Sequence, residues 1–469
     1  MTARGIGFLL GALALLATCL LPTPADLSRA GFVVAGLTVL MAAWWMTEAL
    51  PLTATAFMPF LVLPFAGVMS AKDIAGEYYS EILFLLLGGA FIALAVERTG
   101  LHRRLATGIL RLAGPNAGPR KLLLAFMIAT AILSSFISNT STALIMMPMA
   151  LAVLQAGGAR DEDTTGLSGA LPIGIAFAAT IGGFGTIVGT PTNAISVGLL
   201  EKSLGYRIGF AEWMAYGVPL VLVGVPLAAF IIARVQRVGE TSFDAAQART
   251  AIGAHPEWTA PERRLVPVVA ATFLLWLAQA WLAPYLPEGS LTDGTIAIAA
   301  SLALFLLPDG TGRPILTWKE ADRAPWGVIM MFGGGLALAA GMSASGLAEW
   351  IGQELLPLRA APLIVVALVV TALVILITEF ASNVATASAV MPVIAGLTVA
   401  LGVDPLLLAL PAAIAASWGF MLPAGTGPNA IAWATGRIRM GAMVRSGLWL
   451  DVVGVVLIVG VVWAVRAVV

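Results

Sequence analysis

Charged residues, cysteine and histidine are scarce in this chain of 469 residues. Aspartate, glutamate, lysine and arginine together make up 11% of the sequence, and 25 basic residues balance 25 acidic ones. A net charge of zero argues against a nucleic-acid partner. Cys19 alone excludes a disulfide framework, and His102 and His255 supply no metal cluster. Most metal-dependent and nucleophilic catalytic sites are therefore missing.

Apolar residues dominate the chain instead. Hydrophobic residues make up 59% of the sequence and the mean hydropathy is +0.97, which is typical of an all-α polytopic membrane protein rather than a soluble domain. The N-terminal segment 1–30 contains the apolar run GIGFLLGALALLATCL. This run is about as long as a membrane span requires, so it predicts a first transmembrane helix. A cleaved signal peptide is the alternative interpretation.

Further apolar runs predict the other transmembrane helices. They lie at 31–50, 52–69, 80–98, 170–199, 213–233, 265–285, 292–307, 325–343, 405–433 and 447–467. Two more apolar segments, 120–155 and 361–400, are each interrupted at the centre by a cluster of polar residues. We interpret these two segments as re-entrant hairpins, which enter and leave the membrane on one side. The chain is thus expected to have about 11 transmembrane helices and two hairpins.

The distribution of lysine and arginine sets the predicted topology. With the N-terminus in the cytoplasm and the C-terminus outside, nineteen of the 25 basic residues lie in cytoplasmic segments and six lie outside. This is the bias of the positive-inside rule. If either hairpin crossed the membrane, every later segment would be inverted and the bias would be lost. We therefore expect a multi-pass protein of the plasma (inner) membrane.

Three sequence blocks recur in the same order in the two halves of the chain. LLLGGAFIALAVERTGL (85–101) resembles MMFGGGLALAAGMSASGL (330–347), SNTSTALIMMP (138–148) resembles SNVATASAVMP (382–392), and GTPTNAI (189–195) resembles GTGPNAI (425–431). Five predicted crossings separate the two hairpins, so equivalent parts point in opposite directions across the membrane. The halves are therefore predicted to be inverted repeats, the architecture of many secondary transporters.

The first repeat is expected to cover 31–236 and the second 264–469, with a cytoplasmic linker at 237–263. Each repeat contains scaffold helices, one hairpin and one helix that breaks at its Gly-Thr motif, at 170–199 and 405–433 respectively. Glycine pairs in the first recurring block are more typical of close helix packing than of ligand contact.

The polar tips at Ser138-Asn139 and Ser382-Asn383 are expected to line a cavity, because lipid offers no partners to non-helical backbone. The free N–H groups and the positive end of the half-helix after each tip suit an anion. Carbonyl oxygens of the tips, and of Gly189 and Gly425 in the breaks, are hard ligands for a small cation. The structural alternative is that these polar residues only cap helices or bond between spans.

Lysine, arginine and histidine are missing from both tips and both breaks. A divalent anion there would lack a fixed positive partner, which is costly in a low dielectric. A co-bound cation would supply the charge, and oxygen ligands without thiolate or imidazole favour sodium. Glu379, the one nearby carboxylate, is interpreted as structural, bonding backbone N–H groups of the hairpin. Asp451 and the run 161–163 are interpreted as solvated ends.

Several motifs together resemble a known family. They are the two Ser-Asn-(Thr/Val) tips, GGFGTIVGTPTNAI, TEFASNVATASAVMP, MLPAGTGPNAI and the early WWMTEALPL. They are similar to those of the divalent anion/sodium symporter family, which includes sodium-coupled dicarboxylate, citrate and sulfate transporters. The similarity covers nearly the whole chain from about residue 31. It implies a homodimer in which a scaffold domain stays fixed while a transport domain of hairpins and broken helices moves as an elevator.

The resemblance also implies roles for individual residues. The implied substrate-binding residues are Ser138, Asn139, Thr140, Thr190, Pro191, Ser382, Asn383, Val384, Thr426 and Gly427. At least two sodium ions are implied, one held by Ser134, Ser138, Asn139 and Gly189 and the other by Thr378, Ala381, Asn383 and Gly425. Two positions depart from the family pattern, because Val384 removes a hydroxyl from the second tip and Gly427 replaces the usual proline. These departures are expected to change selectivity rather than abolish binding.

These features favour sodium-coupled symport of a divalent anion, with C4 dicarboxylates such as succinate, malate or fumarate as first choice. Sulfate, tartrate and citrate stay open as substrates, and a sodium-independent dicarboxylate exchanger is the alternative mechanism. A membrane enzyme is not expected, because Ser138 has no histidine, lysine or aspartate partner nearby in sequence. An anion channel is also less expected, because two opposed hairpins suit an alternating-access transporter better than a continuous pore.

Overall fold

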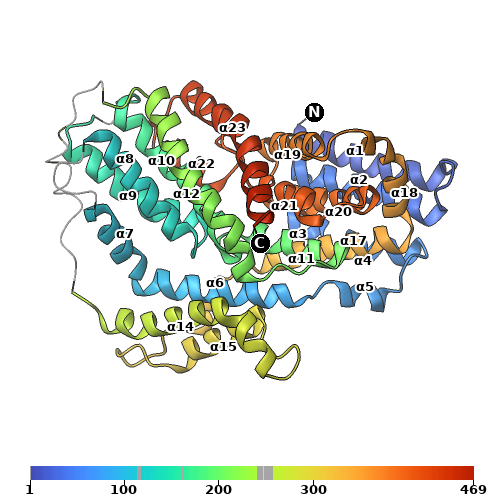
Figure 1. The fold of residues 1–469 in the computed structure, drawn as a ribbon, viewed down its shortest axis with the longest axis horizontal. Helices are drawn as coiled ribbons and strands as arrows, with labels where there is room; N and C mark the ends of the chain where they lie inside the picture. The colour runs from blue at the N-terminus through green and yellow to red at the C-terminus, as the bar shows by residue number, and fades with distance from the viewer. Residues whose placement is uncertain are drawn as a thin grey trace.

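The computed structural model describes residues 2–112, 118–160, 162–239, 244, 247 and 257–468. Within these ranges every regular element is a helix and there is no strand. Figure 1 shows an elongated arrangement, with α1 (Ala3–Leu20) and α2 (Arg29–Thr47) toward one end and α8 (Pro119–Ser134) and α9 (Asn139–Ala156) toward the other. His255 and Asp161 lie outside the described residues.

The remaining helices follow in chain order. In the first half they are α3 (Leu52–Thr55), α4 (Met58–Phe65), α5 (Ala71–Glu77), α6 (Glu81–Thr99), α7 (Leu101–Leu112), α10 (Gly166–Gly182), η1 (Gly183–Gly185), η2 (Ile187–Gly189), α11 (Pro191–Leu204) and α12 (Phe210–Val235). In the second half they are α14 (Ala260–Leu282), η3 (Ala283–Tyr285), α15 (Asp293–Leu306), α16 (Trp318–Ala321), α17 (Trp326–Ala344), α18 (Leu347–Glu354), η4 (Leu356–Ala360), α19 (Leu363–Phe380), α20 (Asn383–Leu401), α21 (Pro405–Ala415), α22 (Gly427–Ala434) and α23 (Met440–Arg466).

Eleven helices in the described ranges are long and apolar enough to cross a membrane, judged by length and composition. The number agrees with the prediction, but the members differ, because α9, α19 and α20 of the predicted hairpins also qualify. The prediction of one helix at 52–69 is wrong. That segment forms α3 and α4, because Pro59 in the first turn of α4 lacks the N–H needed to continue α3.

Bulky apolar side chains remain exposed on several long helices. Leu222 and Phe230 on α12, Leu274 and Trp281 on α14, and Trp449 on α23 are each 57 to 76% exposed. Surfaces of this kind suit lipid better than water. By contrast, every residue of α10 is buried, so α10 lies at the centre of the helices that surround it.

Glycines of the first recurring block make the close helix contacts that were predicted. A Cβ atom placed on Gly88 would lie 2.6 Å from the Cβ of Ala297, and one placed on Gly334 would lie 2.6 Å from the Cβ of Ala56. No larger residue fits at either contact. Gly88 lets α6 lie close to α15, and Gly334 lets α17 lie equally close to the turn after α3. The two halves of the chain thus repeat a packing contact as well as a sequence.

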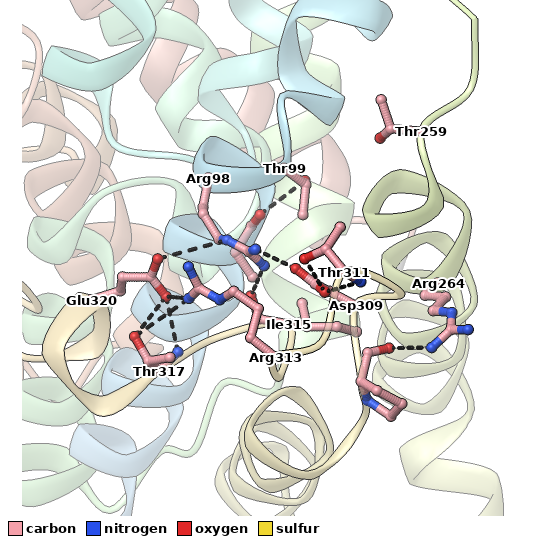
Figure 2. Close-up of polar contacts among 12 residues, drawn as sticks. Arg98, Thr99, Thr259, Arg264, Asp309, Thr311, Arg313, Ile315, Thr317 and Glu320 are labelled. Atoms are coloured by element: carbon pink, nitrogen blue, oxygen red, sulfur yellow. Dashed lines mark hydrogen bonds and ion pairs between the residues drawn. The ribbon is translucent and has the colours of Figure 1, made fainter.

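An ionic cluster fastens the C-terminal end of α6 to the segment between α15 and α16 (Figure 2). Arg98 donates hydrogen bonds to the Asp309 carboxylate and to the carbonyl oxygen of Ile315, and its Nε lies 3.6 Å from Oε1 of Glu320. Thr311 donates both its N–H and its hydroxyl to Asp309, each at 2.7 Å. Burial raises the pKa of the Asp309 carboxyl, but the bonds from Arg98 and Thr311 outweigh it, so that the pKa lies well below its usual range. The charged form of this pair therefore holds α6 in place.

Candidate functional site

Both predicted hairpins are pairs of helices joined by a short polar turn. In the turn between α8 and α9, the hydroxyl of Ser138 accepts a hydrogen bond from the backbone N–H of Ser141 at 3.1 Å. In the turn between α19 and α20, the hydroxyl of Ser382 accepts one from Ala385 at 3.2 Å. Each serine caps the helix that follows, so the polar clusters do start new helices as the sequence indicated.

Both predicted broken helices are interrupted at their Gly-Thr motifs. The short turns η1 and η2 separate α10 from α11, and Thr190 has an extended backbone before Pro191, the first residue of α11. A longer non-helical segment separates α21 from α22, and the hydroxyl of Thr426 accepts a hydrogen bond from Asn429 at 3.2 Å. These breaks expose N–H and C=O groups that a continuous helix would pair.

Helices of the two repeats pair crosswise, and the first tip lies against the break of the second repeat. Helix α9 packs on α22, and α20 packs on α11. A Cβ atom placed on Gly427 would lie 2.4 Å from the hydroxyl oxygen of Thr140, so the first tip touches the start of α22. The first tip and the second break, which both carry predicted substrate residues, therefore meet.

The predicted site residues differ in exposure. Among the predicted substrate residues, the exposed ones are Ser138, Thr140 and Gly427, the partly buried ones are Asn139, Pro191, Ser382, Asn383, Val384 and Thr426, and Thr190 is buried. Among the remaining predicted sodium ligands, Ser134, Gly189, Thr378 and Ala381 are buried and Gly425 is partly buried. The predicted sodium ligands thus lie deeper than most of the predicted substrate residues.

The first sodium-ligand set centres on the hydroxyl of Ser134. This oxygen lies 2.8 Å from Oδ1 of Asn139 and 2.6 Å from the carbonyl oxygen of Ala179 on α10. A hydroxyl has one proton to donate, so three oxygens meet here with one proton among them. Gly189 lies against Gly183, which in turn lies against Asn139.

The second set repeats this arrangement around Thr378. Its hydroxyl oxygen lies 3.0 Å from Oδ1 of Asn383 and 2.6 Å from the carbonyl oxygen of Ala416. Gly425 lies near the end of α19, where a Cβ atom placed on it would be 3.5 Å from the carbonyl oxygen of Glu379. Ala381 forms the extended link between α19 and α20. Clusters of neutral oxygens with too few protons are the donor sets that hard cations prefer.

Two asparagines that brace the breaks were not predicted as site residues. The side-chain amide of Asn193 donates to the carbonyl oxygens of Gly183 and Thr186 at 2.8 and 2.9 Å. The amide of Asn429 donates to Leu422 at 3.0 Å and to Phe420 at 3.5 Å. Both Oδ1 atoms are buried without a hydrogen-bond partner among the described residues. Their shared place in the repeated GTxxNAI motif was the signal that could have identified them.

Glu379 is structural, but the hydrogen bonds differ from those predicted. Its buried carboxylate accepts backbone N–H groups of Phe420 and Met421, the latter at 3.0 Å. These groups belong to the second break and not to the hairpin. The interpretation of Asp451 as a solvated end is wrong, because this residue is 5% exposed and its carboxyl faces Glu379. The cause is the length of α23, which begins at Met440, so that Asp451 lies about three turns inside the helix.

Comparison with known protein families matches residues 4–468 to the sodium:sulfate symporter transmembrane region. The chain belongs to this family. Among its relatives are proteins named sodium-dependent dicarboxylate transporter SdcS. The one from Staphylococcus saprophyticus is 39% identical over 471 residues, which cover 98% of this chain and 90% of the relative. The one from Staphylococcus aureus strain USA300 is 38% identical over 477 residues, covering 99% and 91%.

Two solved structures share the fold of this family member. The Alcanivorax borkumensis YdaH transporter aligns with a TM-score of 0.60 at 14% identity, covering 92% of this chain and 97% of that one. The Neisseria gonorrhoeae protein MtrF, described as one of a class of antimetabolite efflux pumps, aligns with a TM-score of 0.58 at 14% identity, covering 98% and 94%. The likeness at this identity concerns architecture alone.

Proposed function

We propose that the protein is a secondary active transporter that couples the inward movement of sodium to the symport of a divalent anion. C4 dicarboxylates such as succinate, malate or fumarate are the proposed substrates, in line with relatives named sodium-dependent dicarboxylate transporters. The observation that carries the proposal is the pair of matching oxygen clusters around Ser134 and Thr378, each beside a polar tip.

The chemistry of the site supports coupling to a cation. No lysine, arginine or histidine occurs in either tip or either Gly-Thr break, so the carboxylates of a substrate would face only neutral donors. A dianion in such surroundings is stabilised when positive charge binds beside it. Sodium ions in the two oxygen clusters, at least two in number, would supply this charge. Their sites lie within a few residues of both tips.

The substrate would lie between the two tips and the two breaks. The helices α9, α20, α11 and α22 each begin at a tip or a break, so their free N–H groups and positive N-terminal ends would face the substrate. Ser138, Asn139 and Thr140 would bind one carboxylate together with Thr426 and Gly427. Ser382, Asn383 and Val384 would contact the other together with Thr190 and Pro191. Thr190 is buried, so it would contribute by shaping the start of α11.

The transport cycle is proposed to be an elevator movement within a homodimer. The helix pairs α8–α9 and α19–α20 would be re-entrant hairpins of a transport domain, whose inverted repeats carry the site across the membrane. The N-terminus would lie in the cytoplasm and the C-terminus outside. The ionic cluster around Arg98 and Asp309 (Figure 2) would belong to the scaffold that stays in place.

Uptake of labelled succinate into proteoliposomes tests the proposal. An inward sodium gradient is expected to drive accumulation, whereas potassium or proton gradients of the same size are not. The alternative exchanger would ignore sodium and would need anion loaded inside the vesicles. That result would replace symport with exchange on the same fold. Competition with sulfate, citrate and tartrate would then rank the substrates.

Substitutions at the oxygen clusters test the site assignment. Asn139→Ala and Asn383→Ala are each expected to abolish sodium-driven uptake while the protein stays folded. Thr378→Val should do the same, because it removes a central oxygen of the second cluster. Thr398→Val is the matched control, since this buried threonine of α20 only bonds the carbonyl oxygen of Ile394 in its own helix at 2.7 Å. Equal activity of Thr378→Val and Thr398→Val would refute the second sodium site.

A further inference from the structure

A cavity of about 490 Å³ lies where the end of α12 meets the beginnings of α10 and α23. Helix α12 packs against both α10 and α23 (Figure 1). The polar side chains that line the cavity are Thr165, Gln236, Arg237, Arg439 and Arg445. Since α10 rises about 1.5 Å per residue, its first turn lies about 24 Å from the break at its other end. We propose that this cavity is a second anion site, which binds a phosphate group.

The three arginines give the cavity its positive charge. Arg237, Arg439 and Arg445 are exposed, and none of them forms an ion pair with a carboxylate among the described residues. Guanidinium groups bind phosphate oxygens in pairs and keep their charge at any physiological pH. Arg237 also has a left-handed backbone with φ of 54° at the end of α12, a position that favours glycine. The chain thus keeps a charged side chain where a smaller residue would be easier to accommodate.

Two helix beginnings add further N–H donors. The residues before α10 and α23 are Thr165 and Arg439, and neither side chain caps its helix. The N–H of Gly166 already bonds the carbonyl oxygen of Gln236 at 2.9 Å. In α23 the N–H groups of Ala442 and Met443 already bond the carbonyl oxygen of Arg439. The N–H groups of Met440 and Gly441, and those of Leu167 and Ser168 in α10, are the ones available to an anion beside the positive helix ends.

A buried amide beside the cavity lacks a hydrogen-bond partner. Gln236 is 1% exposed and lines the cavity, yet neither its Nε2 nor its Oε1 has a hydrogen-bond partner among the described residues. Its Nε2 lies against the first turn of α10, 2.9 Å from where a Cβ atom of Gly169 would be. Buried amides are normally paired. Both atoms have less than 1 Å² of accessible surface, so the side chain of Gln236 would have to turn toward the cavity before its Nε2 could donate to a phosphate oxygen.

Phosphate can reach this cavity from two sources. Phe230 on α12 and Leu448 and Trp449 on α23 expose apolar surface one to two turns from the arginines, where lipid acyl chains could lie beside a bound headgroup. The cavity is also large enough for inorganic phosphate. The shared chemistry is a phosphate monoanion or dianion held by guanidinium and amide donors, and the experiment separates the sources.

The test uses purified full-length protein in a neutral detergent. Native mass spectrometry measures binding of phosphatidylglycerol, with phosphatidylcholine as the neutral reference, and thermal unfolding measures protection by inorganic phosphate. The double variant Arg439→Gln/Arg445→Gln is expected to weaken binding of the preferred probe about tenfold or more. Arg263→Gln, which changes an exposed arginine of α14 away from the cavity, is the matched control and should bind like the wild type.

Each outcome decides the proposal. A preference for phosphatidylglycerol that only the double variant loses assigns a lipid headgroup. Protection by inorganic phosphate that the double variant loses, without a lipid preference, assigns a soluble anion. If the wild type, the control and the double variant bind both probes equally, the site does not exist. If the double variant does not fold, Gln236→Leu and Arg445→Gln replace it, and unchanged binding by both would overturn the proposal.

Discussion

The two repeats hold their breaks with side chains of opposite chemistry at one equivalent position. In the first repeat this position is Ser135, whose hydroxyl donates to the carbonyl oxygen of Gly182 at 2.8 Å. In the second repeat it is Glu379, whose carboxylate accepts the N–H groups of Phe420 and Met421. The hydroxyl of Ser135 thus donates to a backbone carbonyl group of the first break. The carboxylate of Glu379 instead accepts from backbone N–H groups of the second break.

Apart from this position, the two repeats share the same hydrogen-bond arrangement. The hydroxyl–asparagine–carbonyl cluster of Ser134 recurs at Thr378, and Asn193 and Asn429 each bond two carbonyl oxygens across a break. The comparison teaches that the hydroxyl–asparagine–carbonyl geometry is shared, while only the second repeat braces its break with the buried carboxyl group of Glu379. Substitutions that separate the shared parts from the unshared ones therefore test the proposed mechanism.

The largest difference between the copies is expected at their unshared position. Glu379→Gln removes the charge and turns an amide N–H toward the donors of Phe420 and Met421, while Ser135→Ala removes one neutral hydrogen bond. Hydrogen bonds to charged groups contribute about 1.5 to 3 kcal/mol each. We expect Glu379→Gln to lower the initial rate of sodium-driven succinate uptake about a hundredfold and Ser135→Ala about threefold. Equal losses would show that the two breaks are braced alike.

The shared asparagines should instead behave alike. Asn193→Ala and Asn429→Ala each remove two hydrogen bonds to carbonyl oxygens of a break. At about 1 kcal/mol for each bond, we expect the apparent affinity for sodium to fall about tenfold to thirtyfold in both variants. The sodium dependence of uptake measures this, with succinate held at saturation. A large effect in one variant and none in the other would contradict the equivalence of the two sites.

The contact between the first tip and the second break can be tested at Gly427. A methyl group there would meet the Thr140 hydroxyl at 2.4 Å, and overpacking of this kind costs about 1 to 3 kcal/mol. We expect Gly427→Ala to weaken the apparent affinity for succinate about tenfold. In a double-mutant cycle with Thr140→Ala the losses should not add, because the second change removes the clashing oxygen. Strictly additive losses would mean that the first tip does not touch the second break.

The smallest effect is expected where the tips themselves differ. Val384→Thr gives the second tip the hydroxyl that Thr140 gives the first, without a change in charge or much change in volume. We expect the apparent affinity for succinate to change by no more than about threefold, while the order of competing anions shifts. Thr140→Val is the reciprocal variant and should lower affinity more, since it removes an existing donor. A complete loss of uptake in Val384→Thr would show that position 384 of the second tip admits no polar side chain.

The helices, tips and breaks could be predicted from the sequence because each leaves a local signal. Polar residues inside apolar runs marked Ser138 and Ser382, and the recurrence of the same letters at matching places marked the breaks. The segment 52–69 was mispredicted because its mean hydropathy hides the effect of Pro59 on the backbone. Hydropathy describes where a segment can lie, whereas proline decides whether its helix continues.

Contacts between distant segments could not be predicted in the same way. The partners of Glu379 lie about forty residues away, in the second break, and nothing in either segment specifies the other. Asp451 was misread because the predicted span 447–467 placed it near the start of the helix, whereas α23 begins at Met440 and extends beyond the apolar run. The bracing role of Asn193 and Asn429 required the folded breaks, since their bonds join residues whose separation depends on the 3₁₀ turns.

The crossed pairing of α9 with α22 and of α20 with α11 has an evolutionary consequence. A chain of half this length would own one tip and one break, but the partners of both would be absent. If the halves are inverted as we propose, two such half-chains would have to insert in opposite orientations to bring their tips and breaks together. A duplication would then have joined two subunits that already paired, so a substitution in one half acts on a tip or break of the other.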